Sequence, residues 1–118
     1  MKKFLRGFVF AFSGIAYAFR SQFNIRFHSL AAMLVLIMGF ILRLNILEWC
    51  IILFCIGSVI AAELINTSLE INVDISSPER NEKAGQAKDV AAAAVLVTAM
   101  MSAVIGTIIF LPKIIDNF

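Results

Sequence analysis

Four polar side chains, Glu63, Asn66, Glu70 and Asp74, stand where a long apolar run meets a polar segment. The run Trp49–Ala62 contains no charged residue, and no Gly or Pro interrupts the segment that follows it. At 100° per residue the four side chains fall at about 0°, 300°, 340° and 20° on a helical wheel, so they form one polar stripe. An isolated carboxylate at membrane depth is costly, so several on one helix face indicate a metal, a proton or a partner charge.

The composition indicates an integral membrane protein. Of the 118 residues, 61% are hydrophobic, and the mean hydropathy is +0.94. Soluble domains contain only about 45–50% apolar residues. A soluble fold of this length leaves a large share of its area exposed, so it could not hide this much apolar surface. We therefore expect a single domain over residues 1–118 with an all-α integral membrane fold.

Three apolar stretches are long enough, together with their flanks, to cross a bilayer as helices. We expect spans at 29–47, 48–75 and 86–112, with a loop at 76–85. An arrangement with two spans and one re-entrant segment is the alternative, because the uncharged run Leu30–Leu42 is short for a span.

The N-terminal segment is expected to form an amphipathic helix over residues 2–24 that lies on the membrane surface. Basic and polar residues share one face of this helix, and phenylalanines cover much of the rest. We reject a signal peptide, because no small-x-small cleavage pattern precedes the charges that end the apolar stretch. His28, the single histidine, follows this helix, and we interpret it as a hydrogen-bonded interfacial residue rather than a ligand.

The distribution of positive charge predicts the orientation in the membrane. Lys and Arg concentrate before the first expected span and between the second and third, whereas only Arg43 and Lys113 lie at the opposite ends. By the positive-inside rule, the N-terminus and the polar stripe face the cytoplasm and the C-terminus faces outside. Nucleotides and Mg²⁺ are available on that side.

The polar stripe and the nearby Lys88 suit phosphoryl transfer. Mg²⁺ binds one or two carboxylates together with phosphate oxygens, and a base takes the proton of the nucleophile. Neither G-x-x-x-x-G-K-[ST] nor G-x-G-x-x-G occurs, so any ATP site must be unconventional. The residue types alone also permit a proton or cation transporter, because transporters keep carboxylates in membranes.

Two segments carry a recognisable pair of motifs. Ala62–Asp74 reads A-E-L-I-N-T-S-L-E-I-N-V-D, and Ala87–Leu96 reads A-K-D-V-A-A-A-A-V-L. Together they resemble the signature of the small prokaryotic diacylglycerol kinase family, which includes the undecaprenol kinases. The resemblance implies a homotrimeric helical bundle with an interfacial helix and three transmembrane helices, and active sites built by neighbouring protomers. It also implies ATP and Mg²⁺ as cofactors, a membrane lipid alcohol as substrate, the bacterial inner membrane as location, and no nucleic-acid partner.

The resemblance also implies roles for the matching positions. Glu63 would be the general base that deprotonates the lipid hydroxyl, and Glu70 would bind the Mg²⁺ that bridges the phosphates. Asn66 and Asp74 would support the catalytic carboxylates, and Lys88 would stabilise phosphate charge. Further nucleotide contacts are expected at Lys3, Arg6, Phe10, Glu79, Arg80, Asn81 and Asp89.

Two positions depart from the family pattern. Gln22 stands where the family usually has a second metal-binding glutamate. An amide supplies a neutral oxygen but no negative charge, so metal affinity should fall unless another carboxylate contributes. Phe10 stands where an aromatic residue with a hydroxyl group is often found, which removes one hydrogen bond to the nucleotide. A catalytically silent family member is therefore one alternative.

The expected substrate is undecaprenol, which would be converted to undecaprenyl phosphate. The patterns Asn24-x-Arg26-x-His28 and Ser77-Pro78-Glu79 resemble the undecaprenol-kinase branch. The alternative within the family is a diacylglycerol kinase that makes phosphatidic acid. A proton-coupled multidrug transporter that uses Glu63 as its proton carrier is the alternative from another class, and it would need four spans.

Overall fold

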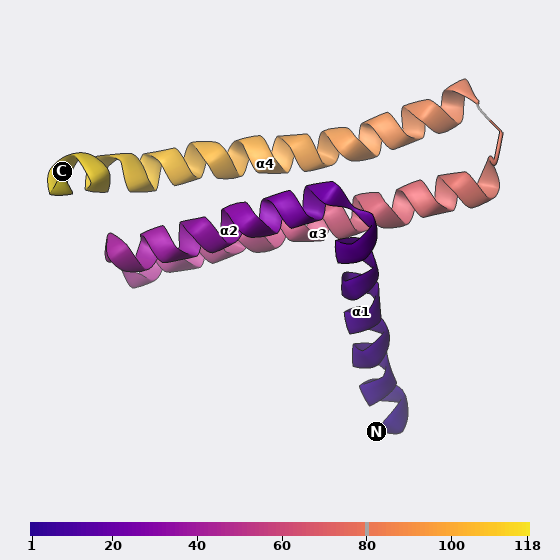
Figure 1. Cartoon of the computed structure of the whole chain (residues 1–118), viewed down its shortest axis with the longest axis horizontal. Helices are drawn as coiled ribbons and strands as arrows, with labels where there is room; N and C mark the ends of the chain where they lie inside the picture. The colour runs from indigo at the N-terminus through magenta and orange to yellow at the C-terminus, as the bar shows by residue number, and fades with distance from the viewer. Residues whose placement is uncertain (80) are drawn as a thin grey trace.

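The computed structural model describes residues 1–79 and 81–118, which form helices joined by short connections. The helices are α1 (Lys2–Ser21), α2 (Phe23–Ile41), α3 (Ile46–Ser76) and α4 (Glu82–Asn117). Figure 1 shows α2, α3 and α4 alongside one another, while α1 leaves the bundle at a steep angle. The part of the chain that the structure describes contains no strand, so the expected all-α architecture is confirmed.

Helices α2, α3 and α4 are each long and apolar enough to cross a membrane, which makes this a multi-pass membrane protein. The 19 residues of α2 extend about 28 Å, close to the roughly 30 Å of a hydrocarbon core. The structure therefore favours three spans over the alternative with a re-entrant segment. The fourth span that a small multidrug transporter needs is not found among residues 1–79 and 81–118.

The surface helix is shorter than expected. We expected it to reach residue 24, but α1 ends at Ser21 and Gln22 adopts an extended conformation with φ −118° and ψ 119°. Because α2 begins at once with Phe23, the first span starts six positions before the expected residue 29 and ends at Ile41 rather than at residue 47.

The last helix is longer at both ends than the expected span at 86–112. It begins at Glu82, inside the expected loop, because the side-chain oxygen of Asn81 accepts a hydrogen bond from the Lys83 N–H at 2.9 Å. At the other end α4 continues through Pro112 to Asn117.

A tight turn joins α2 to α3 at the end of the bundle far from the polar stripe. Arg43 adopts a positive φ of 54° there. The side chain of Asn45 accepts from the Glu48 N–H at 2.9 Å, and the Glu48 side chain accepts from the Asn45 N–H at 2.9 Å. This capping box fixes the start of α3. Lys113 Nζ lies 3.1 Å from Glu48 Oε2, so the same end of α3 is also tied to α4.

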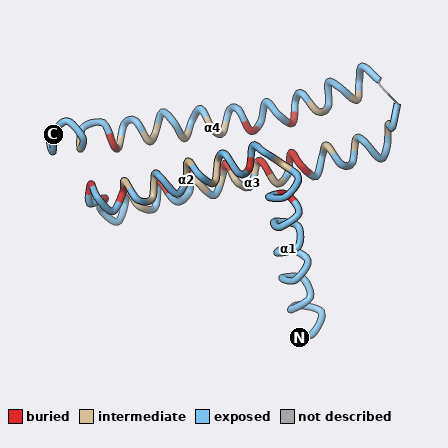
Figure 2. Tube along the Cα trace, viewed as in Figure 1, coloured by how far each residue is buried: buried red, intermediate tan, exposed pale blue. Residues whose placement is uncertain are grey.

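A cluster of buried apolar residues packs at that same end. Its buried members come from the turn, from α3 and from α4, and they are Leu42, Leu44, Ile52 and Phe110. Trp49 packs over Gly39, where an added Cβ would lie 2.7 Å from the indole ring. Elsewhere most of α2 and α4 is exposed in the single chain (Figure 2). That apolar surface is available to lipid or to other copies of the chain.

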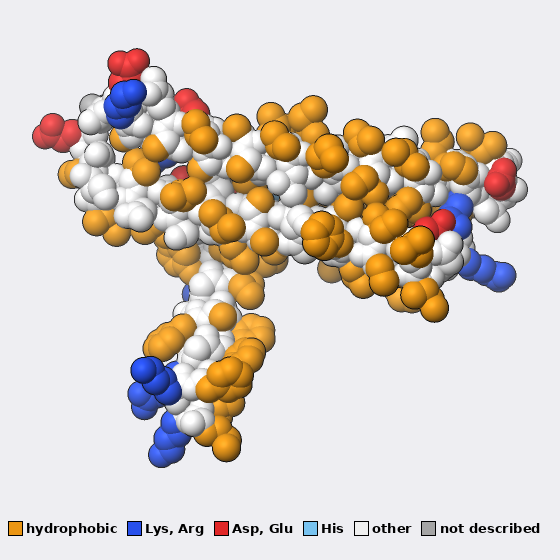
Figure 3. Space-filling view, turned by 180° about the vertical axis from the view of Figure 1, so that it is seen from behind, with side chains coloured by type: hydrophobic (Ala, Val, Ile, Leu, Met, Phe, Trp, Pro, Cys, Tyr) orange, Lys and Arg blue, Asp and Glu red, His pale blue; other side chains and the backbone are white. Residues whose placement is uncertain are grey.

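Helix α1 has the orientation of an interfacial helix. In Figure 3 its Lys and Arg side chains face the end of the bundle that carries the α3–α4 connection, and its hydrophobic side chains face the opposite end. Such a helix places its apolar face against the acyl chains and its basic face against headgroups. Around Ala18 it passes α3 near Leu64 and Thr67, so an α1 that lies on the membrane would set the membrane surface at this stretch of α3.

The length of α3 places the polar stripe relative to the bilayer. Its 31 residues extend about 46 Å, whereas about 20 residues suffice to cross a hydrocarbon core. If α3 enters the hydrocarbon core of the bilayer at Ile46, about 20 residues bring it to the other side near Ile65. Glu63 therefore lies at the boundary, and Glu70 and Asp74 lie beyond it, in agreement with the level that α1 marks.

The contact between Gly39 and Trp49 gives a test of the packing between α2 and α3. We expect Gly39→Ala to destabilise the protein by about 1–3 kcal/mol, because the added methyl group displaces the indole ring from a packed position. Thermal unfolding in detergent would measure the change. Gly85→Ala is the matched control, because nothing lies within 4 Å of a Cβ added there. Equal melting temperatures for the two variants would contradict this account of the packing.

Candidate active site

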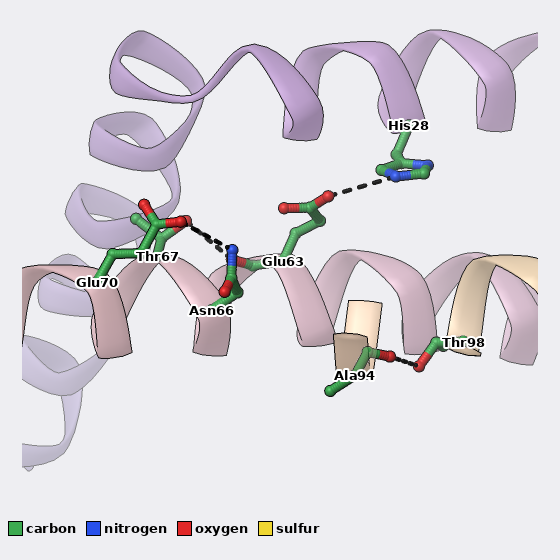
Figure 4. Close-up of polar contacts among 7 residues, drawn as sticks. All are labelled: His28, Glu63, Asn66, Thr67, Glu70, Ala94 and Thr98. Atoms are coloured by element: carbon green, nitrogen blue, oxygen red, sulfur yellow. Dashed lines mark hydrogen bonds and ion pairs between the residues drawn. The ribbon is translucent and has the colours of Figure 1, made fainter. Parts of the chain in front are cut away.

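Glu63 carries a buried carboxylate on α3, at the level where α1 crosses the bundle. The residue is 1% exposed. His28 on α2 places its Nε2 atom 3.3 Å from Glu63 Oε1, within ion-pair distance (Figure 4). No described residue gives Oε1 a well-aligned hydrogen bond. Among the described residues, His28 is therefore the side chain that faces this carboxylate, whereas its sequence position indicated only an interfacial residue.

Glu70 is held by two amides rather than by a cation. Asn66 Nδ2 donates to Glu70 Oε1 at 3.3 Å, and Gln22 Nε2 donates to Glu70 Oε2 at 3.4 Å. Both distances exceed the usual range of about 2.7–3.2 Å, so these hydrogen bonds are weak. Gln22 and Glu70 are 48 positions apart in sequence, and the break between α1 and α2 brings them together.

The surroundings of Glu70 fit a Mg²⁺ ion that obtains most of its ligands from outside the protein. Within residues 1–79 and 81–118, no three His, Cys, Asp or Glu side chains gather closely enough to hold a metal. Mg²⁺ commonly binds through one or two carboxylates and completes its octahedron with waters and phosphate oxygens. Glu70 supplies one such carboxylate, and the buried Asn66 Oδ1 has no hydrogen-bond partner among the described residues. One carboxylate and one unpartnered amide oxygen would hold a Mg²⁺ ion only together with ligands from outside the protein.

Asp74 and Lys88 form an ion pair that joins α3 to α4 beyond the membrane boundary. Their side chains are 66% and 39% exposed, so the pair contributes little to stability. Its main effect is positional, because Asp74 lies one helical turn beyond Glu70 and draws the ammonium group toward the same end of α3.

Three expected nucleotide contacts, Lys3, Arg6 and Phe10, do not meet the other site residues within one chain. All three lie on the part of α1 that points away from the bundle (Figure 1), and they are exposed. Lys3 is about 22 Å along the helix from Ala18, the buried residue of α1 that lines a pocket together with residues of α3. A role for these residues would require a site on a neighbouring copy of the chain.

The remaining expected contacts lie around the α3–α4 connection. Glu79 and Asp89 are exposed, and Asn81 caps the start of α4. Arg80 lies outside the described residues. Asn81 therefore has a structural role as the N-cap of α4, which its position in the family pattern did not indicate.

An apolar cavity of about 310 Å³ lies between α2, α3 and α4, on the membrane side of Glu63. His28 and Ser102 are its only polar lining residues among the described positions. The apolar lining includes Val35, Ile52 and Val59. His28 thus contacts the buried carboxylate and also borders this cavity.

The sequence is similar to known membrane lipid kinases over nearly its whole length. The family model for prokaryotic diacylglycerol kinase matches residues 9–110. An undecaprenol kinase of Bacillus subtilis is 44% identical over 97% of this chain and 93% of its own length. A diacylglycerol kinase of Synechocystis is 33% identical over 95% of this chain and 65% of its own length.

The pairing of Gln22 with Glu70 gives a test of the metal site. We expect Gln22→Glu to lower the melting temperature without Mg²⁺, because two carboxylates would then face each other, and to increase the stabilisation that Mg²⁺ produces. Thermal unfolding over a MgCl₂ titration would measure both effects. Gln22→Ala is the control, since it removes the amide without adding charge. A Mg²⁺ response of Gln22→Glu equal to that of the unmodified protein would exclude position 22 as a ligand position.

Proposed function

The chain belongs to the prokaryotic diacylglycerol kinase family, and we propose that it transfers the γ-phosphoryl group of ATP to the hydroxyl of undecaprenol in the bacterial inner membrane. Family membership makes it an ATP-dependent lipid kinase. The observation that carries the proposal is the Glu63 carboxylate, buried where the apolar part of α3 meets its polar end. A base at that boundary can reach a hydroxyl that stays in the membrane.

The choice of undecaprenol rests on similarity. The relative with the higher identity and the fuller mutual coverage is an undecaprenol kinase. Diacylglycerol is the second candidate, because a diacylglycerol kinase is also similar over most of this chain.

Glu63 acts as the general base in the proposed reaction. Its carboxylate accepts the proton of the lipid hydroxyl while the hydroxyl oxygen attacks the γ-phosphorus of ATP. A new O–P bond forms, the bond between the γ-phosphorus and the bridging oxygen breaks, and ADP leaves with the electron pair. Because Glu63 is almost fully buried, the proton transfer takes place away from bulk water.

The polar end of α3 handles the phosphates. Glu70 would bind Mg²⁺, which neutralises phosphate charge when bound, and Asn66 orients the Glu70 carboxylate through its 3.3 Å hydrogen bond. Lys88, drawn in by Asp74, supplies a cation for the charge of the transferring group.

The proposed active unit is a homotrimer with its active sites on the cytoplasmic side. Neighbouring protomers would bring Lys3, Arg6 and Phe10 of one chain to the Glu63–Glu70 region of another. Two features support this arrangement: α1 extends away from its own bundle (Figure 1), and α2 and α4 leave broad apolar faces uncovered. The expected cytoplasmic N-terminus and outer C-terminus follow from the positive-inside rule.

Replacement of the proposed base tests the mechanism. We expect Glu63→Gln to lower kcat for lipid phosphorylation by about 10²–10⁴-fold, because the amide cannot accept the hydroxyl proton. Transfer of labelled phosphate from ATP to lipid would measure it, with size-exclusion chromatography to verify the fold. Glu82→Gln is the matched control, because Glu82 is exposed at the start of α4 and lies outside the polar stripe. An active Glu63→Gln variant would remove Glu63 as the base.

A lipid panel tests the substrate. We expect the purified protein to phosphorylate undecaprenol with a higher kcat/KM than diacylglycerol when each lipid is supplied with labelled ATP in the same micelles. A strong preference for diacylglycerol would overturn the proposed substrate. Absence of transfer to any lipid alcohol would favour a silent family member, and activity that then appears in Gln22→Glu would identify the missing carboxylate as the cause.

A further inference from the structure

We propose that His28 is a positioning residue for Glu63: its Nε2–H holds the Oε1 atom of the carboxylate, so that Oε2 is the atom that receives the proton of the lipid hydroxyl. This inference rests on the proposed function and gives a role in the site to a residue that the sequence alone indicated only as an interfacial residue and as part of a substrate-branch pattern. The contact that carries it is the 3.3 Å distance between His28 Nε2 and Glu63 Oε1.

The chemistry of the two groups defines the direction of the interaction. An ionised carboxylate can only accept hydrogen bonds, so in the proposed interaction the imidazole nitrogen that faces it carries the hydrogen and donates to the buried Oε1, which has no other partner among the described residues. Glu63 is 1% exposed, and leaving a buried carboxylate without a partner would be costly. Among the described residues, only His28 places a basic side chain within ion-pair distance of the Glu63 carboxylate.

The other polar side chains nearby are already engaged elsewhere. The amides of Asn66 and Gln22 both donate to Glu70. The Thr67 hydroxyl donates to the main-chain carbonyl oxygen of Glu63 at 2.8 Å and not to its carboxylate. The carboxylates of Glu63 and Glu70 therefore face different groups: two amides donate hydrogen bonds to Glu70, whereas the imidazole of His28 lies within ion-pair distance of the buried Glu63 Oε1, which has no hydrogen-bond partner among the described residues.

His28 also lies between the Glu63 carboxylate and the apolar cavity on the membrane side of the site. The imidazole borders the apolar cavity between α2, α3 and α4, and its side chain is 23% exposed. Phe27 packs edge-to-face against the ring, with centroids 5.6 Å apart. A lipid hydroxyl that approaches from the apolar side thus meets Glu63 beside a ring whose orientation is restricted.

Loss of positioning should affect the chemical step more than nucleotide binding. The base itself would remain, but its carboxylate could rotate away from the hydroxyl. Misplacement of a catalytic group by about 1 Å can cost about 10²-fold in rate. We therefore expect a lower kcat and an unchanged KM for ATP, because His28 does not contact the Asn66–Glu70–Gln22 cluster or the Asp74–Lys88 pair.

Three substitutions in the full-length protein test this role. His28→Leu keeps much of the side-chain volume and removes the N–H donor, His28→Gln keeps an N–H donor, and His28→Ala leaves space for added imidazole. We expect His28→Leu to lower kcat for undecaprenol by 10- to 100-fold with KM for ATP within twofold of the unmodified protein. His28→Gln should retain most of the activity, and imidazole should restore His28→Ala but not His28→Leu.

The outcomes separate this inference from the proposed function. Full activity of His28→Leu, or equal losses in all three variants without rescue by imidazole, would overturn the positioning role while leaving the kinase assignment intact. If His28→Leu fails to fold, His28→Ala with and without imidazole decides the question. An unmodified protein that phosphorylates no lipid alcohol would instead remove the proposed function, and this inference with it.

Discussion

The central constraint on this protein is the burial of one carboxylate at the edge of the membrane. Glu63 is 1% exposed and lies about where α3 leaves the hydrocarbon core. A charged group there needs a partner, because neither lipid nor bulk water compensates it. The approach of α2 supplies that partner in His28. The packing of α2 against α3 therefore decides the environment of the group that we propose as the base.

The rest of α3 follows from its length. The helix is anchored at one end by the Asn45–Glu48 capping box and the ion pair with Lys113, and its excess length must emerge at the other end. One helix thereby carries an apolar segment, a boundary carboxylate and a polar end without any change of secondary structure. In the proposed reaction, successive turns of this helix would therefore contact the lipid alcohol and the water-soluble nucleotide.

Two features of the single chain support the proposed assembly. A packed cluster of buried apolar residues lies at the end of the bundle far from Glu63, while only 11% of the residues in the apolar stretches of α2 and of α4 are buried. Helix α1 also carries Lys3 and Arg6 away from the carboxylates of its own bundle. Assembly with further copies would cover the exposed apolar faces and return basic side chains to the phosphates, which is why we include a homotrimer in the proposal.

The sequence by itself determined the helices, the three spans and the polar stripe. A helical period and an apolar length are local properties, so they can be read from consecutive residues such as Trp49–Ala62 and Glu63–Asp74. The helix boundaries were less predictable: the break at Gln22 and the early start of α4 depend on one extended residue and one cap. The family motifs selected Glu63, Asn66, Glu70, Asp74 and Lys88, but they gave His28 no role in the site.

Only the tertiary structure decided which of these residues meet. His28 with Glu63, Gln22 with Glu70 and Asp74 with Lys88 each join two elements. Helical periodicity defines the faces of each helix, but it does not specify which faces pack together or at what depth. For that reason His28 was interpreted as an ordinary interfacial residue from the sequence, and its place beside the buried carboxylate emerged only when α2 and α3 were seen together.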